Sequence, residues 1–171
     1  MELKDMIRNI PDFPSPGIMF RDITTVLKDP VGLAMAVDTM ADSLKGMDFD
    51  LVLGPESRGF IFGVPLAYKM GKGFVPARKA GKLPGETASK SYDLEYGQAA
   101  IEIHKDAIKP GHKIVIVDDL LATGGTAKAV AELVTELGAQ VVGMAFLIEL
   151  APLGGRDVLA GYDNVKSVLV Y

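Results

Sequence analysis

Four consecutive β-branched residues, 114–117, are followed at once by two acidic residues, Asp118 and Asp119. A continuous apolar run of this kind is typical of a strand buried on both faces, as in a parallel sheet. Residues 122–126 (Ala-Thr-Gly-Gly-Thr) come next, and a helical pattern begins at their end. This order indicates an α/β fold in which the carboxyl end of a buried strand leads through a short loop into a helix.

Residues 122–126, which we call the glycine loop, have the composition of an anion site. Glycines let the backbone approach a ligand closely, so successive N–H groups can surround an anion, and the helix N-terminus adds its positive dipole end. Thr123 and Thr126 can donate hydrogen bonds to phosphate oxygens. The acid pair, Asp118 and Asp119, would repel phosphate, so we expect it to contact ribose hydroxyls, directly or through a metal. The stretch predicts a phosphorylated-sugar site; the alternative is a plain strand-to-helix turn with solvated aspartates.

Other nucleotide motifs and several classes of protein are excluded. The stretch lacks the Gly-x-x-x-x-Gly-Lys-Ser/Thr spacing of P-loops and the Gly-x-Gly-x-x-Gly fingerprint of dinucleotide sites. The net charge is −4, and no Lys/Arg run exceeds two residues, which argues against nonspecific nucleic-acid binding. The absence of cysteine excludes disulfides, thiolate zinc sites and a cysteine nucleophile. With no membrane-spanning apolar run and no signal-peptide pattern, we expect a cytoplasmic protein that contacts neither nucleic acid nor membrane.

Strand and helix patterns alternate along the chain, which predicts a mostly parallel, twisted sheet with helices on both faces. The length suits a single domain, residues 1–171. Strands are expected at residues 51–53, 74–77, 99–103, 113–117, 140–148 and 167–171. Helices are expected at residues 1–9, 30–44, 58–70, 126–137 and 154–160.

Residues 79–96 interrupt this alternation, because they contain no sustained apolar period and carry three Gly or Pro residues between positions 81 and 85. A loop this long inside a compact domain is usually functional or disordered. Basic residues lie at its start: Arg78, Lys79 and Lys82. We therefore interpret residues 79–96 as a mobile lid over a site for anions; the alternative is a passive surface loop.

Five segments together carry a resemblance to a known family. Residues 117–126 resemble the 5-phosphoribosyl pyrophosphate motif of type I phosphoribosyltransferases. Four more are similar to the members of that family that use adenine: residues 13–17 (Phe-Pro-Ser-Pro-Gly), 20–23 (Phe-Arg-Asp-Ile), 56–60 (Glu-Ser-Arg-Gly-Phe) and 92–97 (Tyr-Asp-Leu-Glu-Tyr-Gly). The similarity runs from about residue 10 to residue 149 and matches loosely beyond residue 150. It implies a type I phosphoribosyltransferase fold with an N-terminal base-binding hood, residues 1–30, and the lid.

The resemblance also implies an activity. Phosphoribose would pass from 5-phosphoribosyl pyrophosphate to adenine, giving AMP and pyrophosphate in purine salvage. Mg²⁺ would be the cofactor, held mainly by substrate phosphates and ribose hydroxyls and not by protein ligands. A homodimer is implied as well. Two alternatives stay open: an enzyme for another purine (hypoxanthine, guanine or xanthine), and a regulator that senses 5-phosphoribosyl pyrophosphate and binds nucleic acid, which the charge balance and the lack of an added domain disfavour.

Residue roles follow from the same resemblance. The catalytic residues would be Glu95, which handles a proton of the base, Arg58, and the acid pair, which stabilises a cationic ribose in the transition state. A cis peptide between Glu56 and Ser57 would aim backbone N–H groups at pyrophosphate. The substrate-binding residues would be Ile18, Met19, Phe20 and Arg21 for the base, Glu56, Ser57, Arg78, Lys79 and Lys82 for pyrophosphate, Tyr96 over the reacting centre, and Ala122, Thr123, Gly124, Gly125 and Thr126 for the 5′-phosphate.

Overall fold

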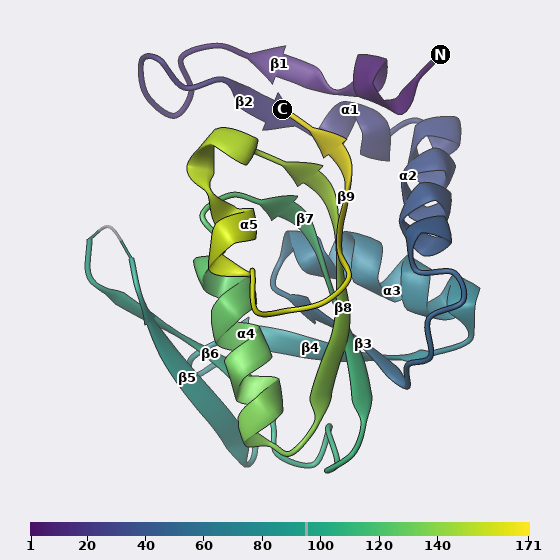
Figure 1. Ribbon diagram of the computed structural model, residues 1–171. Coiled ribbons are helices and arrows are strands. Elements are labelled where there is room, and N and C mark those ends of the chain that lie inside the picture. Colours follow the sequence, from purple (N-terminus) through teal and green to yellow (C-terminus); the bar gives the residue numbers. More distant parts are fainter. Residues whose placement is uncertain (95) are drawn as a thin grey trace. The chain divides into compact units, whose positions relative to one another are not determined.

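A computed structural model describes residues 1–94 and 96–171 of the chain (Figure 1). These residues form two compact units, Met1–Thr39 and Met40–Tyr171. The expected hood, residues 1–30, falls within the first unit and ends before it does. The single-domain boundary and the hood therefore stay predictions.

The second unit is built on a sheet whose described strands lie in the order β5-β6-β4-β3-β7-β8-β9. The bounds are β3 Leu51–Pro55, β4 Gly73–Lys79, β5 Thr87–Asp93, β6 Gln98–His104, β7 Lys113–Leu121, β8 Gln140–Glu149 and β9 Val165–Val170. In the run β4-β3-β7-β8-β9, each strand is parallel to the next. Strand β6 is antiparallel to both of its neighbours, β4 and β5. This mostly parallel sheet confirms the predicted fold class.

Helices cover both faces of that sheet. In Figure 1, α4 (Gly125–Glu136) lies on one side of β7, and α3 (Arg58–Met70) lies on the other. Ile114 and Ile116 belong to the core that α4 covers, while α3 contacts β3, β4 and β7. Because side chains alternate between the faces of a strand, Val115 and Val117 point to the α3 side. All four are fully buried, which explains the unbroken β-branched run.

The first unit has its own small sheet. A 3₁₀-helix η1 (Leu3–Met6) precedes β1 (Arg8–Ile10), which pairs antiparallel with β2 (Phe20–Asp22) so that Arg8 stands opposite Asp22. Helix α1 (Thr24–Leu27) follows, and α2 (Pro30–Ser43) continues into the second unit. The second unit also contains η2 (Ala151–Leu153) and α5 (Gly155–Val158) between β8 and β9.

Two local predictions were wrong. The expected helix at residues 1–9 is a single 3₁₀ turn followed by β1, because residues 8–10 pair with β2, which the local pattern does not reveal. The expected loop at residues 79–96 contains β5, which pairs with β6 over its whole length. Strand β5 lies at the edge of the sheet and carries mostly polar, half-buried side chains, so it has no apolar alternation. The mobility of this segment stays a prediction.

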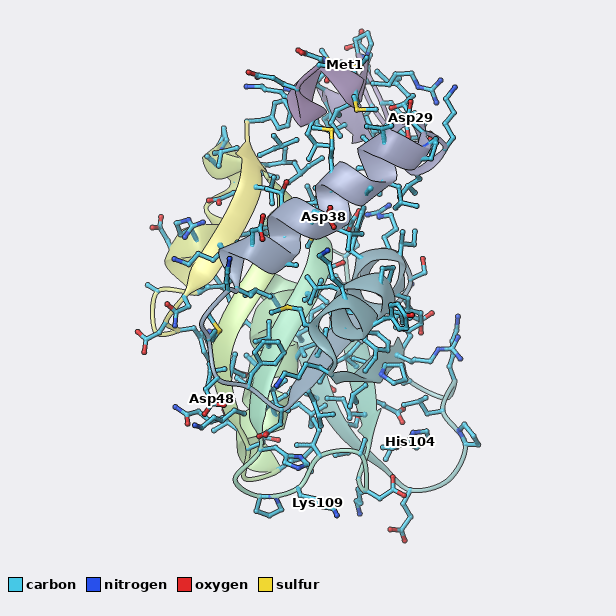
Figure 2. All side chains as sticks on the ribbon, turned by 90° about the vertical axis from the view of Figure 1, so that its right-hand side faces the viewer. Met1, Asp29, Asp38, Asp48, His104 and Lys109 are labelled. Atoms are coloured by element: carbon cyan, nitrogen blue, oxygen red, sulfur yellow. The ribbon has the colours of Figure 1, made fainter. Side chains whose placement is uncertain are left out.

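Charged side chains gather at the amino end of the parallel strands. The Lys113 ammonium, at the start of β7, donates to the Asp48 carboxylate at 2.7 Å. Figure 2 shows Asp48, His104 and Lys109 at the same end of the second unit. His104 Nε2 lies 2.7 Å from the Pro84 carbonyl oxygen. Among the described residues, no helix is long and apolar enough to cross a membrane.

Candidate active site

A cavity of about 350 Å³ lies at the carboxyl ends of β3 and β7, within the second unit. Ligands of open α/β sheets bind at this end of the strands. The cavity is lined by the turn between β3 and α3, the end of β7, the glycine loop, the start of α4, and single residues of β4 and β8: Glu56, Ser57, Arg58, Lys79, Asp118, Asp119, Leu120, Leu121, Ala122, Thr123, Gly124, Gly125, Thr126, Ala127 and Phe146. The structure therefore brings two sequence segments, predicted separately, to one site.

The glycine loop joins β7 to α4 with a left-handed residue. Gly124 is the N-cap of α4 and has φ +85°, a conformation that residues with a side chain rarely adopt. The helix starts at Gly125, so its first N–H groups lack helical partners and remain available at the cavity. The loop thus presents backbone donors and two threonine hydroxyls to the same space.

The acid pair is asymmetric. The Asp119 carboxylate accepts a charge-assisted contact from Arg58 Nε at 2.7 Å, whereas Asp118 Oδ1 accepts the Asp119 backbone N–H at 2.8 Å. Burial, together with the neighbouring Asp119 carboxylate, raises the pKa of Asp118 well above its usual value. Asp119 therefore has a guanidinium partner, whereas burial and the neighbouring carboxylate disfavour the charged form of Asp118.

Helix α3 reaches the acid pair through a glycine. A Cβ added at Gly59 would lie 2.9 Å from Pro55 Cδ and 3.2 Å from Asp118 Oδ1. Any larger residue would push the first turn of α3 away from β7. Gly59 therefore lets Arg58, its neighbour in the chain, sit within reach of Asp119.

The Glu56 carboxylate, just after the end of β3, contacts several basic residues. It accepts the Lys79 backbone N–H at 2.7 Å and contacts Lys82 Nζ at 3.3 Å and Arg78 Nε at 3.4 Å. Burial disfavours its charged form, but the Lys79 hydrogen bond and the two cations outweigh burial and lower the pKa of Glu56. The Glu56–Ser57 peptide is cis, as the resemblance implied. Arg78 and Lys82 do not line the cavity themselves; Glu56 ties them to its rim.

The hairpin formed by β5 and β6, at the edge of the sheet, contacts the start of α4. The hydroxyl of Tyr92, near the end of β5, lies 3.4 Å from Thr126 Oγ1. Tyr96, predicted to lie over the reacting centre, is 89% exposed. Glu95, the predicted proton-handling residue, lies outside the described residues.

The predicted base-binding residues form an open apolar surface within the first unit. Phe20 packs edge-on against Phe13, with ring centroids 5.1 Å apart. Ile18 and Met19 are 47% and 43% exposed, which is high for large apolar side chains. The Arg21 guanidinium donates a hydrogen bond to Asn9 Oδ1.

Some lining residues were not predicted. Leu120, Leu121 and Ala127 flank predicted residues, and their positions in the motif could have indicated them. Phe146 stands opposite Asp118 on the neighbouring strand β8. It lies in a uniformly apolar run, so nothing in the sequence distinguishes it from a core residue.

Comparison with known proteins agrees with this geometry. Residues 27–169 match the phosphoribosyl transferase domain family. The chain belongs to the phosphoribosyltransferase family, as the sequence motifs indicated.

The relatives of this chain indicate which members of the family it resembles. An adenine phosphoribosyltransferase from Agathobacter rectalis is 62% identical over 99% of this chain and 97% of its own length. The crystal structure of adenine phosphoribosyltransferase from Thermoanaerobacter pseudethanolicus shares 54% identity, with a TM-score of 0.95 over 99% of this chain and 98% of that one. The Saccharomyces cerevisiae enzyme, solved with D-2,5-dideoxy-2,5-imino-altritol 1,6-bisphosphate and adenine, shares 42% identity and a TM-score of 0.91 over 98% of this chain and 96% of that one. Within the family, the chain groups with the adenine phosphoribosyltransferases.

Proposed function

We propose that the chain transfers phosphoribose from 5-phosphoribosyl pyrophosphate to adenine, giving AMP and pyrophosphate in purine salvage. The observation that carries this proposal is the cavity in which the acid pair and the glycine loop meet the Glu56–Ser57 turn. Its relatives support the choice of base, since they are adenine phosphoribosyltransferases and the yeast relative was solved with adenine and an imino-sugar bisphosphate.

The reaction exchanges one bond at the anomeric carbon for another. The bond from that carbon to pyrophosphate breaks, and the leaving oxygen keeps the electron pair; a ring nitrogen of adenine forms the new bond and loses its proton. Positive charge builds on the ribose in between. Carboxylates placed beside the ribose stabilise this charge, which is the role we assign to Asp118 and Asp119. The glycine loop holds the 5′-phosphate and thereby fixes the ribose against them.

The leaving group carries growing negative charge and needs donors. The cavity offers the Ser57 turn and the side chains of Arg58 and Lys79, with Arg78 and Lys82 gathered at its rim by Glu56. We assign these groups to pyrophosphate. Arg58 then has two partners, Asp119 and the leaving group, and so links the two charges that develop in the reaction.

Mg²⁺ fits this donor set. Among residues 1–94 and 96–171, no cluster of three or more His, Cys, Asp or Glu side chains could hold a metal, whereas Mg²⁺ is usually bound by substrate phosphates, waters and one or two carboxylates. Asp118 and Asp119 would meet the ion through the ribose hydroxyls that they hold. When bound, it would neutralise charge on the pyrophosphate.

Adenine is assigned to the open surface of the first unit. The Phe20 ring offers a flat apolar face of the kind on which a purine stacks, and the exposed side chains of Ile18 and Met19 extend it. The backbone around Arg21 would supply hydrogen bonds to the base edge. Glu95 would take up the proton released by adenine, and Tyr96 would cover the reacting centre.

A homodimer is part of the proposal. Ile61, Val64 and Tyr68 repeat along α3 at a helical spacing, and they are 37%, 48% and 88% exposed. Residues three and four apart share a helix face, so these three form an apolar stripe that a second copy would cover. We also assign the enzyme to the cytoplasm. A chain without cysteine forms no disulfide and so does not need an oxidising compartment to fold.

Turnover of the four purines, each with 5-phosphoribosyl pyrophosphate and Mg²⁺, tests the assignment directly. Adenine should be used preferentially, with AMP as product, and a preference for hypoxanthine, guanine or xanthine would contradict it. Phe20→Ala should raise KM for adenine about tenfold through lost stacking and leave KM for 5-phosphoribosyl pyrophosphate unchanged. Nucleic-acid binding without turnover would instead favour a sensing regulator.

A further inference from the structure

The glycine loop rests on a turn that no sequence motif marked. Gly155, the first residue of α5, packs directly against the loop backbone. A Cβ added at Gly155 would overlap the carbonyl oxygen of Ala122 and lie 2.8 Å from Leu121 Cδ1. From the other side, a Cβ at Gly124 would lie 2.9 Å from the Gly155 carbonyl oxygen. Both contacts involve backbone atoms, which cannot swing aside as a side-chain end can.

The next residue clamps this turn in place. Arg156 donates from Nε and Nη2 to the two carboxylate oxygens of Glu149, at 3.0 and 2.7 Å. It also donates from Nη1 to the Val165 carbonyl at 2.8 Å and from Nη2 to Ser167 Oγ at 3.2 Å. A two-pronged guanidinium–carboxylate contact fixes orientation as well as distance. Arg156 therefore holds α5 between β8 and β9.

The clamp is built into the strand beside the loop. Glu149 is 5% exposed and pairs with Leu121, the last residue of β7 before the glycine loop. The Leu150 N–H donates to the Leu121 carbonyl at 2.9 Å. The glycine loop is thus fixed at its start by the pairing of Leu121 with β8, and on one side by its packing against Gly155. Glu149 takes part in both, because it pairs with Leu121 and binds Arg156, the neighbour of Gly155.

We propose that Gly155 is a positioning residue for the 5′-phosphate, that its turn forms the floor of the glycine loop, and that the Glu149–Arg156 pair sets the height of that floor. The inference rests on the proposed binding of the 5′-phosphate by the glycine loop. Gly155 touches no substrate itself. It acts by holding the loop N–H groups where the phosphate oxygens meet them, and an added methyl group would lift the loop.

The test compares ligands that carry the 5′-phosphate with one that lacks it. For Gly155→Ala, we expect the Kd of AMP and KM for 5-phosphoribosyl pyrophosphate to rise about tenfold or more, because small misplacements of a positioned group are amplified. KM for adenine should stay near that of the wild type. Gly161→Ala is the matched control, since nothing lies within 4 Å of a Cβ there and its φ is not left-handed. Equal weakening of AMP and adenine, or no change in AMP binding, would overturn the proposal.

A second variant covers the case in which Gly155→Ala does not fold. Arg156→Lys keeps the charge beside Glu149 but loses the fork, and we expect a threefold to tenfold loss, roughly, in affinity for AMP alone. Wild-type AMP binding by this variant would also overturn the proposal. Thr126→Ala distinguishes an error in the assignment of the 5′-phosphate to the glycine loop from an error in the role of the Gly155 turn. If it leaves AMP binding intact, the assignment of the phosphate to the loop is wrong; if it weakens AMP while Gly155→Ala does not, only the floor is wrong.

Discussion

Arg58 Nε lies 2.7 Å from Asp119 Oδ2 and joins the first turn of α3 to the end of β7. The contact links the two halves of the cavity, one that we assign to pyrophosphate and one that we assign to ribose. It also distinguishes the two members of the acid pair, because Asp118 makes no such contact with a guanidinium among the ion pairs of the described residues.

Asp119→Asn should lower kcat about a hundredfold, because it removes the carboxylate beside the developing ribose cation. It also removes the charge partner of Arg58. Steady-state kinetics with both substrates measures the effect, and circular dichroism checks the fold. Asp163→Asn, at an exposed position, serves as the control. A variant with wild-type kcat would show that Asp119 has no part in stabilising the transition state.

Asp118→Asn should raise the free energy of unfolding near pH 7 and lower the activity. The pKa of Asp118 is raised by burial and by the Asp119 carboxylate. The folded state therefore keeps a proton that the unfolded state has lost, and wild-type stability declines as pH rises from about 4, the unfolded-state pKa, through the raised value. Asparagine cannot ionise and avoids this loss.

Urea unfolding at a series of pH values tests this expectation. The free energy of unfolding of Asp118→Asn should exceed that of the wild type near pH 7, and the difference should vanish below about pH 4. The same variant should lose activity about tenfold or more, because it removes the carboxylate that, once ionised, stabilises the ribose cation. A difference that stays constant with pH would contradict the raised pKa.

Asp22→Asn should destabilise the first unit at neutral pH. The Thr24 hydroxyl and N–H, and then the Arg8 guanidinium, lower the pKa of Asp22 to about 2. A lowered pKa contributes stability above the unfolded-state value, about 4, that is lost as pH falls toward 2. Because Arg8 is half exposed, we expect a loss of about 1–2 kcal/mol at pH 7.

Thermal or urea unfolding of Asp22→Asn and of Asp42→Asn, an exposed control on α2, gives the comparison. The deficit of Asp22→Asn should shrink between about pH 4 and pH 2, where the wild-type carboxylate also becomes neutral. If the deficit were unchanged at pH 2, packing and not charge would account for it.

Tyr92→Phe should affect one substrate more than the other. The ring stays in place, but the hydroxyl that lies 3.4 Å from Thr126 Oγ1 is lost. One hydrogen bond of this kind contributes about 1 kcal/mol, so KM for 5-phosphoribosyl pyrophosphate should rise about twofold to fivefold. KM for adenine and the unfolding temperature should change little.

Tyr162→Phe removes a hydroxyl elsewhere in the second unit and is the control for Tyr92→Phe. If Tyr92 acts through Thr126, the double variant Tyr92→Phe/Thr126→Ala should be no worse than Thr126→Ala alone. Additive losses would show that Tyr92 acts independently of the loop.

Features whose parts are close in sequence were predicted well. The buried strand, the acid pair, the glycine loop and α4 lie in one stretch of the chain, which specifies them through β-branched burial, glycine conformation and helix start. The expected end of the strand at residue 117 was too early, because β7 runs to Leu121 and includes the acid pair. The mostly parallel sheet followed from the alternation of elements. Strand β5 was missed because its stability comes from pairing with β6, and its own side chains are mostly polar.

The sequence by itself determined the chemistry of the site: two carboxylates, two hydroxyls and a backbone able to surround a phosphate, all on residues 118–126. Only the tertiary structure decided what surrounds them. Arg58 reaches Asp119 from a different strand end, and Phe146 and the Gly155 turn come from parts of the chain with no motif of their own. Local propensity acts over a few residues, whereas these contacts arise when distant strands pair and bury their side chains together.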